Sequence, residues 1–103
     1  MKPYPQARLI ELYRQQMQPF MDPDAVTLLR WCDRVETLAH FNVARKGWSY
    51  EQAGTLIDEV RELTMRWREE LPTWVVELPA EDGTVLSRHI QAPTYQQAIQ
   101  LFD

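Results

Sequence analysis

Apolar residues recur at helical spacing through the first two thirds of the chain. In residues 6–18, Leu9 and Tyr13 lie on one face of a predicted helix. Phe20 extends this apolar face. We expect Pro19 to end the helix, because proline lacks the backbone N–H that a helix interior uses.

A longer apolar stripe predicts a second helix over residues 23–46. Its members are spaced mainly three or four residues apart: Leu28, Trp31, Cys32, Val35, Leu38, Ala39 and Val43. At the start, Asp22 is expected to cap the helix, Pro23 to take the first helical position and Asp24 to favour the positive end of the dipole. Gly47 follows the stripe as a C-cap glycine.

A third helix is predicted to begin after Ser49, which forms a capping-box pattern with Gln52. Its apolar stripe is the cleanest in the chain: Ala53, Leu56, Ile57, Val60, Leu63, Trp67 and Leu71. Pro72 ends it. Only a few residues around Gly47 and Trp48 separate the second and third helices, so we expect an antiparallel hairpin in which the two stripes face each other.

After Pro72 the apolar period changes from helical to two, which predicts two β-strands joined by the loop 81–83. A three-residue loop with Gly83 in the left-handed region pairs Leu78 with Leu86, and Trp74 with Ile90. A two-residue turn would instead pair Leu78 with a serine, so the apolar match favours the first register.

The last segment predicts a short helix over residues 95–102, capped by Thr94 and Gln97. Because a helix of this length does not persist alone, Ile99 and Phe102 are expected to dock on the core.

Taken together, the pattern predicts an α+β fold that is mainly α. A long antiparallel helical hairpin with an N-terminal helix precedes a C-terminal β-hairpin and a short terminal helix. We expect one domain over residues 1–103, with an extended arm at 1–5, a helical part at 6–71 and the β-hairpin and last helix at 73–103.

Composition restricts the class of protein. Of the 103 residues, 45% are apolar and 25% are charged, with a single cysteine, which excludes a disordered chain, a collagen and a disulfide scaffold. No stretch approaches the roughly 20 apolar residues that span a bilayer. The first residues lack the apolar run of a secretory signal, so we expect a cytoplasmic protein with no membrane partner.

Charge is unevenly distributed along the chain. Residues 1–47 carry seven basic and five acidic groups, whereas residues 48–103 carry four basic and ten acidic groups. Proteins that bind nucleic acid usually present a basic domain or a basic stripe. The charge balance therefore argues against DNA or RNA as the partner.

The residues that could carry chemistry favour structural roles. Cys32 lies within an apolar stripe, where a thiol is buried rather than reactive. His40 shares one side of its helix with Asp33 and Glu36; this spacing would suit a metal, but a solvated pair between His40 and Glu36 is favoured. His89 is expected at the surface. The sequence therefore predicts no catalytic, cofactor-binding or metal site.

The third helix carries two further features. Glycine within a helix is unfavourable, so Gly54 marks either a tolerated defect or the close approach of another backbone, within the chain or across a dimer. Its arginines and carboxylates interleave, with Glu62 and Arg66 at the spacing of a helical ion pair, as do Arg66 and Glu70. We expect a charged, solvated face.

Five residues near the predicted helix–helix turn form a candidate partner-binding surface: Phe41, Arg45, Lys46, Trp48 and Tyr50. Phe41 projects away from its apolar stripe, and the other aromatics flank the turn. Aromatic and arginine side chains are the usual anchors of protein interfaces. The alternative is that the β-hairpin or the first helix covers this end and buries the aromatics.

These features predict a small non-enzymatic protein that binds another protein, as an adaptor or inhibitor, and that forms a homodimer through helices two and three. The alternative is a nucleic-acid-binding transcriptional regulator of winged-helix-like order, with Arg61, Arg66 and Arg68 on the third helix. The length of helices two and three and the carboxylates beside these arginines oppose that alternative.

Overall fold

The computed structural model describes residues 4–17 and 22–102 of the chain. Its elements, in chain order, are α1 (Tyr4–Gln16), α2 (Ala25–Lys46), α3 (Tyr50–Glu69), β1 (Thr73–Pro79), β2 (Val85–Gln91) and α4 (Tyr95–Gln100). The predicted α+β, mainly α architecture is confirmed. Among the helices of the described residues, none combines the length and apolarity needed to cross a bilayer.

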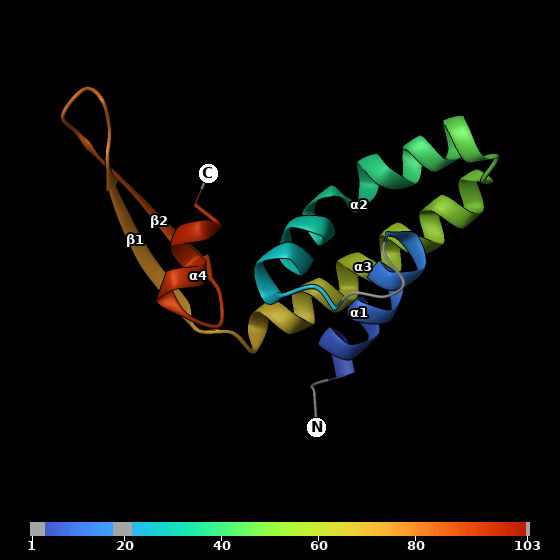
Figure 1. Ribbon diagram of the computed structural model, residues 1–103, viewed down its shortest axis with the longest axis horizontal. Coiled ribbons are helices and arrows are strands. Elements are labelled where there is room, and N and C mark those ends of the chain that lie inside the picture. The colour runs from blue at the N-terminus through green and yellow to red at the C-terminus, as the bar shows by residue number, and fades with distance from the viewer. Residues whose placement is uncertain (1–3, 18–21, 103) are drawn as a thin grey trace.

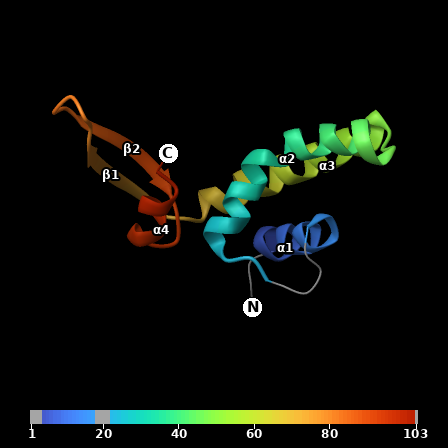
Figure 2. The same ribbon diagram turned by 45° about the horizontal axis from the view of Figure 1, so that its top comes forward.

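The helical part is an antiparallel hairpin of α2 and α3 with α1 against one side of it (Figures 1 and 2). The apolar stripes of the two long helices face each other, as predicted. The buried residues of this main core are Leu9, Ile10, Leu12, Leu28, Leu29, Trp31, Cys32, Val35, Ala39, Ala53, Leu56, Ile57, Val60, Leu63 and Trp67. Tyr13 on α1 meets Trp31 on α2 edge to face, with ring centroids 5.7 Å apart.

Three of the four caps of the two long helices can be compared with the sequence analysis. The capping box of Ser49 and Gln52 is confirmed in both directions, and Gly47 ends α2 with a φ of 72°, in the left-handed region. The expected cap at Asp22 is wrong. Asp24 is the N-cap, and its carboxylate accepts the Thr27 N–H at 2.7 Å, which lowers the pKa of Asp24.

The first helix also begins earlier than predicted. Tyr4 and Pro5 are part of α1, so the arm expected at residues 1–5 is wrong for these two positions. Proline is compatible with the first turn of a helix because the N–H it lacks would have no partner there. Pro19 and Phe20, which were expected to end and extend this helix, lie outside the described residues.

Ion pairs join α3 to α2 on the side away from α1. Arg68 donates to Asp33 at 2.7 Å, and Arg61 pairs with Glu36. The expected pair between His40 and Glu36 is therefore wrong, because Glu36 is already held by an arginine from the facing helix. The charged face of α3 is solvent-exposed as predicted, and Arg66 forms the predicted helical ion pair with Glu62 at 4.0 Å.

The β-hairpin has the predicted register: Leu78 is opposite Leu86 and Trp74 is opposite Ile90. The loop 81–83 is closed by the Ala80 N–H, which donates to the Thr84 carbonyl at 2.8 Å. Gly83 has a φ of 88°, as the three-residue loop requires.

A second, smaller core holds α4 against one face of this hairpin. Its buried residues are Val76, Ala92 and Ala98, with Leu101 and Phe102 packed around them. Ile99, which was expected to dock, is exposed. The hairpin and α4 lie at the opposite end of the molecule from the turn between α2 and α3 (Figure 1).

Candidate protein-binding surface

The turn between α2 and α3 is held rigidly by backbone hydrogen bonds. The N–H groups of Gly47 and Trp48 both donate to the carbonyl of Asn42, and the Ser49 cap starts α3 immediately afterwards. These bonds satisfy groups that a helix end leaves unpaired. The turn therefore presents its side chains on a fixed backbone.

Two of the three aromatic residues predicted for partner binding are well exposed. Phe41 is 53% exposed and Tyr50 is 83% exposed, whereas Trp48 is half-buried and packs against the main core. The β-hairpin covers none of them, because it lies at the other end of the molecule, and α1 stops short of the turn (Figures 1 and 2). A single exposed apolar side chain is ordinary, whereas two exposed aromatic rings near one turn favour a binding surface.

Arg45 and Lys46 supply positive charge beside these aromatics. Both are exposed and lie in the last turn of α2. Neither forms an ion pair with a carboxylate of the described residues, unlike Arg61 and Arg68 on α3. Their charges favour the negative end of the α2 dipole and are free to meet an acidic partner.

Two hollows lie on the α1 side of this region. One, of about 370 Å³, is bordered by Trp48, and a neighbouring one, of about 110 Å³, is bordered by Phe41 and Lys46. Gln16 and Leu56 border both hollows, so the two adjoin. The structure therefore brings three of the five predicted residues to one side of the turn.

The other two predicted residues, Arg45 and Tyr50, border neither hollow. The sequence analysis missed the contributions of Gln16 and Leu56. Leu56 was predicted only as part of the apolar stripe of the third helix and Gln16 belonged to no pattern, because both join this surface only through the packing of α1 on α3.

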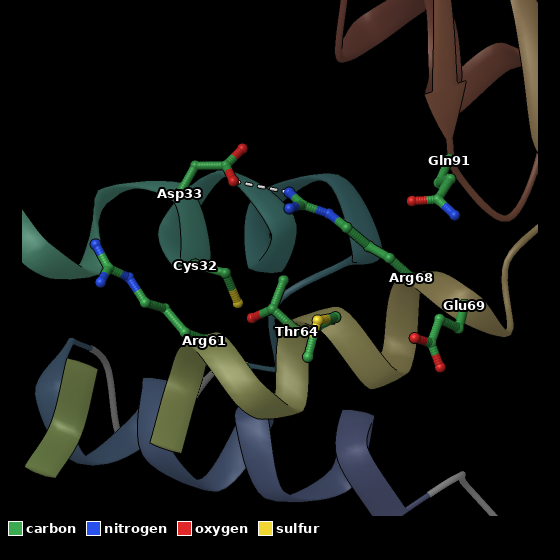
Figure 3. Close-up of a pocket in the computed structure, with 8 residues that line it drawn as sticks. Cys32, Asp33, Arg61, Thr64, Arg68, Glu69 and Gln91 are labelled. Atoms are coloured by element: carbon green, nitrogen blue, oxygen red, sulfur yellow. Dashed lines mark hydrogen bonds and ion pairs between the residues drawn. The ribbon is translucent and has the colours of Figure 1, made fainter. Parts of the chain in front are cut away.

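A cavity of about 400 Å³ at the base of the β-hairpin is lined by a cysteine, a threonine and two arginines that could take part in catalysis (Figure 3). Cys32 and Thr64 lie at its floor, and Arg61 and Arg68 point over it toward α2 (Figure 3). Burial raises the pKa of the Cys32 thiol to about 11, so the thiol is protonated near neutral pH and is a poor nucleophile. Thr64 donates its hydroxyl to the Val60 carbonyl at 2.6 Å, within its own helix.

The histidines occupy separate and exposed positions. His40 is on α2 and His89 is on β2. Within the ranges 4–17 and 22–102, no group of three His, Cys, Asp or Glu side chains is placed to hold a metal ion.

The Gly54 position has open space around it. A Cβ atom added there would meet nothing within 4 Å. A close approach of another backbone from the described part of this chain is therefore wrong as an explanation for this glycine. The dimer contact and the tolerated defect stay as predictions.

No protein-family model, curated protein or solved structure matches this chain.

Proposed function

We propose that the protein is a non-enzymatic binding module that docks on another protein through the end of its α2–α3 hairpin. One observation carries the proposal: Phe41 and Tyr50 are exposed near the α2–α3 turn, where Arg45 and Lys46 have no carboxylate partner among the described residues. Aromatic anchors with flanking basic residues are typical of protein interfaces. The free positive charges favour a partner whose contact surface is acidic.

The fold supports this role because its stability does not depend on the exposed aromatic side chains at the α2–α3 turn. The exposed aromatic rings contribute little to the main core, which is filled by side chains from three helices. They can therefore be used for contact at little cost to the stability of the free protein. The alternative of nucleic-acid binding is weakened, since Arg61 and Arg68 already pair with carboxylates on α2.

The proposal includes a second contact, a homodimer that forms through α2 and α3. None of the elements that the structure describes covers the side of these helices opposite α1 (Figure 2), and Met65 on it is 60% exposed. Sedimentation of a Gly54→Glu variant tests this contact, because the added charge would meet open space in the monomer and the second copy in the dimer.

The binding experiment uses the full chain as bait in a lysate of its native host, followed by titration of the purified captured protein. The variant Phe41→Ala/Tyr50→Ala is expected to weaken that affinity at least about tenfold, as loss of an aromatic anchor does. The matched control is Val75→Ala/Tyr95→Ala, which removes two side chains of 50% and 44% exposure on β1 and α4, away from the proposed contacts. The control is expected to bind as the wild type does.

Charge provides a second, separate test of the same surface. Arg45→Gln/Lys46→Gln is expected to slow association with the captured protein and to reduce its salt dependence, whereas Arg66→Gln on α3 changes neither. Equal affinity of wild type and both double variants for the captured protein contradicts the proposed surface. Tight, steeply salt-dependent binding to a random-sequence DNA duplex favours the nucleic-acid alternative instead.

A further inference from the structure

The two edges of the β-hairpin carry different sets of unpaired backbone groups. The Ala80 N–H donates to Thr84 at 2.8 Å and the Ala92 N–H donates to Pro72 at 3.2 Å. Both bonds join pairs of even-numbered residues within the single register of the hairpin. Since hydrogen-bonded and non-bonded pairs alternate in an antiparallel ladder, the odd-numbered residues point their N–H and C=O groups outward.

On the outer edge of β1, two residues obstruct hydrogen bonding to a further strand. Pro79 occupies an outward position and has no N–H, and Glu77 at another outward position is charged. Proline and charged residues are the devices by which edge strands avoid pairing with other chains. The β1 edge is therefore protected.

The β2 edge has no such protection. Its outward residues are Val85, Ser87, His89 and Gln91, and their backbone groups form no hydrogen bond with any other described residue. β2 contains neither proline nor an acidic residue, and its one arginine, Arg88, lies on the α4 side of the sheet, over the Phe102 ring at 4.9 Å. This edge is a template for one more strand.

The sheet itself lacks support that another strand would supply. It has two strands, and α4 covers only one of its faces. On the uncovered face Val75 and Val85 are 50% and 62% exposed. A two-stranded hairpin alone is marginal in water and needs further strands or packing against a helix, and here α4 supplies that packing on one face only.

We propose that β2 pairs antiparallel with β2 of a second copy of this chain, which creates a four-stranded sheet across a twofold axis. This surface is separate from the α2–α3 end and does not depend on the proposed function. The twofold axis passes beside Ser87. In this register Val85 lies opposite the partner subunit's His89, and Leu86 lies opposite the partner subunit's Arg88.

Three features make β2 complementary to β2 of a second copy. With Ser87 at the axis, the two Arg88 side chains do not face each other, which avoids the like-charge pair that a shift by one residue would create. Leu86, 51% exposed in the monomer, gains the aliphatic stem of an arginine as its neighbour. The hairpins also match in length, because the partner's Gly83 is then level with Gln91.

The test is sedimentation of the full chain from about 10 µM to about 1 mM, with proline variants on the two edges. Ser87→Pro removes the outward N–H at the axis and is expected to weaken the dimer at least tenfold. Glu77→Pro is the matched control, because Glu77 is the direct cross-strand partner of Ser87 and its N–H points to the opposite edge. The control is expected to leave the dimer intact.

Amide hydrogen exchange on the wild type keeps the test independent of how the variants fold. The amides of Ser87 and His89 are expected to become protected as the protein concentration rises, while those of Val75 and Glu77 do not. A chain that stays monomeric to about 1 mM overturns the proposal. So does a dimer that tolerates Ser87→Pro and is lost in Gly54→Glu, which assigns the contact to α2 and α3.

Discussion

The helical part and the C-terminal part of this protein are built on cores of very different depth. Fifteen buried residues from three helices fill the first, and three fill the second, two of them alanines. Large aliphatic and aromatic side chains contribute most of the free energy of burial, so the helical core carries the stability of the fold. The β-hairpin and α4 depend on a thin cluster and on their attachment to α2 and α3.

The two regions also present different surfaces. The helical part exposes side chains on a fixed backbone at its turn, whereas the hairpin exposes backbone groups along an unpaired strand. A surface of the first kind suits recognition of a particular partner through anchors, and one of the second kind suits addition of a strand. The difference in core depth explains why the second region has more to gain from association.

Removing the centre of the deep core should have the largest effect. Trp67 is 2% exposed and is the largest fully buried side chain in residues 4–17 and 22–102. Trp67→Ala is expected to lower the free energy of unfolding by about 3–5 kcal/mol, which approaches the whole stability of a small domain. Urea denaturation measures it. Met65→Ala, two residues away and 60% exposed, should change it by less than about 0.5 kcal/mol.

The equivalent change in the thin cluster should act locally. Val76 is fully buried, and Val76→Ala removes two carbon atoms at a cost of about 2 kcal/mol. The expected result is faster amide exchange throughout β1 and β2 with unchanged exchange in α2 and α3. Val75→Ala, on the exposed face, is the control; equal loss of protection in both variants would show that the buried cluster does not hold the hairpin.

A smaller effect is expected at the start of α3. Ser49→Ala removes the hydroxyl that accepts the Gln52 N–H at 3.0 Å, and should cost about 1 kcal/mol of the free energy of unfolding. Ser49→Asn retains an acceptor and should restore most of that loss. A variant with asparagine that is as unstable as the alanine variant would place the role of Ser49 outside the cap.

Cys32 should make the free energy of unfolding depend on pH, with an effect similar in size to that of Ser49→Ala. Burial raises the pKa of its thiol from 9.0 to about 11, so above pH 9 the unfolded chain loses this proton before the folded one does. The free energy of unfolding should therefore fall as pH rises, by about 1 kcal/mol between pH 9 and pH 10. Cys32→Ala should fall less steeply over this range, and equal slopes would contradict the raised pKa.

Local structure was predictable from the sequence where neighbouring residues decide it. The capping box at Ser49 and the pairing of Leu78 with Leu86 follow from short-range chemistry and are confirmed. Asp22 and Asp24 both fit a cap, and the choice between them depends on where the first helical turn closes, which the residue types do not state.

Features that join distant segments were not predictable in this way. The pairing of Glu36 with Arg61 depends on the register of α2 against α3. That the β-hairpin lies away from the helix–helix turn depends on how α4 meets α2, where Arg30 donates to the Gln100 carbonyl at 2.6 Å. The sequence alone therefore left two alternatives, in which the β-hairpin either covers the candidate surface or leaves it exposed. The arrangement of the helical part and the hairpin shows that the hairpin does not cover it.

Native-state hydrogen exchange, resolved by residue in the wild type, tests the unequal depth of the two cores most directly. We expect the amides of α2 and α3 that pack on Val35, Val60 and Trp67 to open only with global unfolding. The ladder amides of Val76 and Arg88 should open at a clearly lower free energy, through local unfolding of the hairpin. Equal opening free energies in both regions would contradict the account, because the chain would then unfold as one cooperative unit.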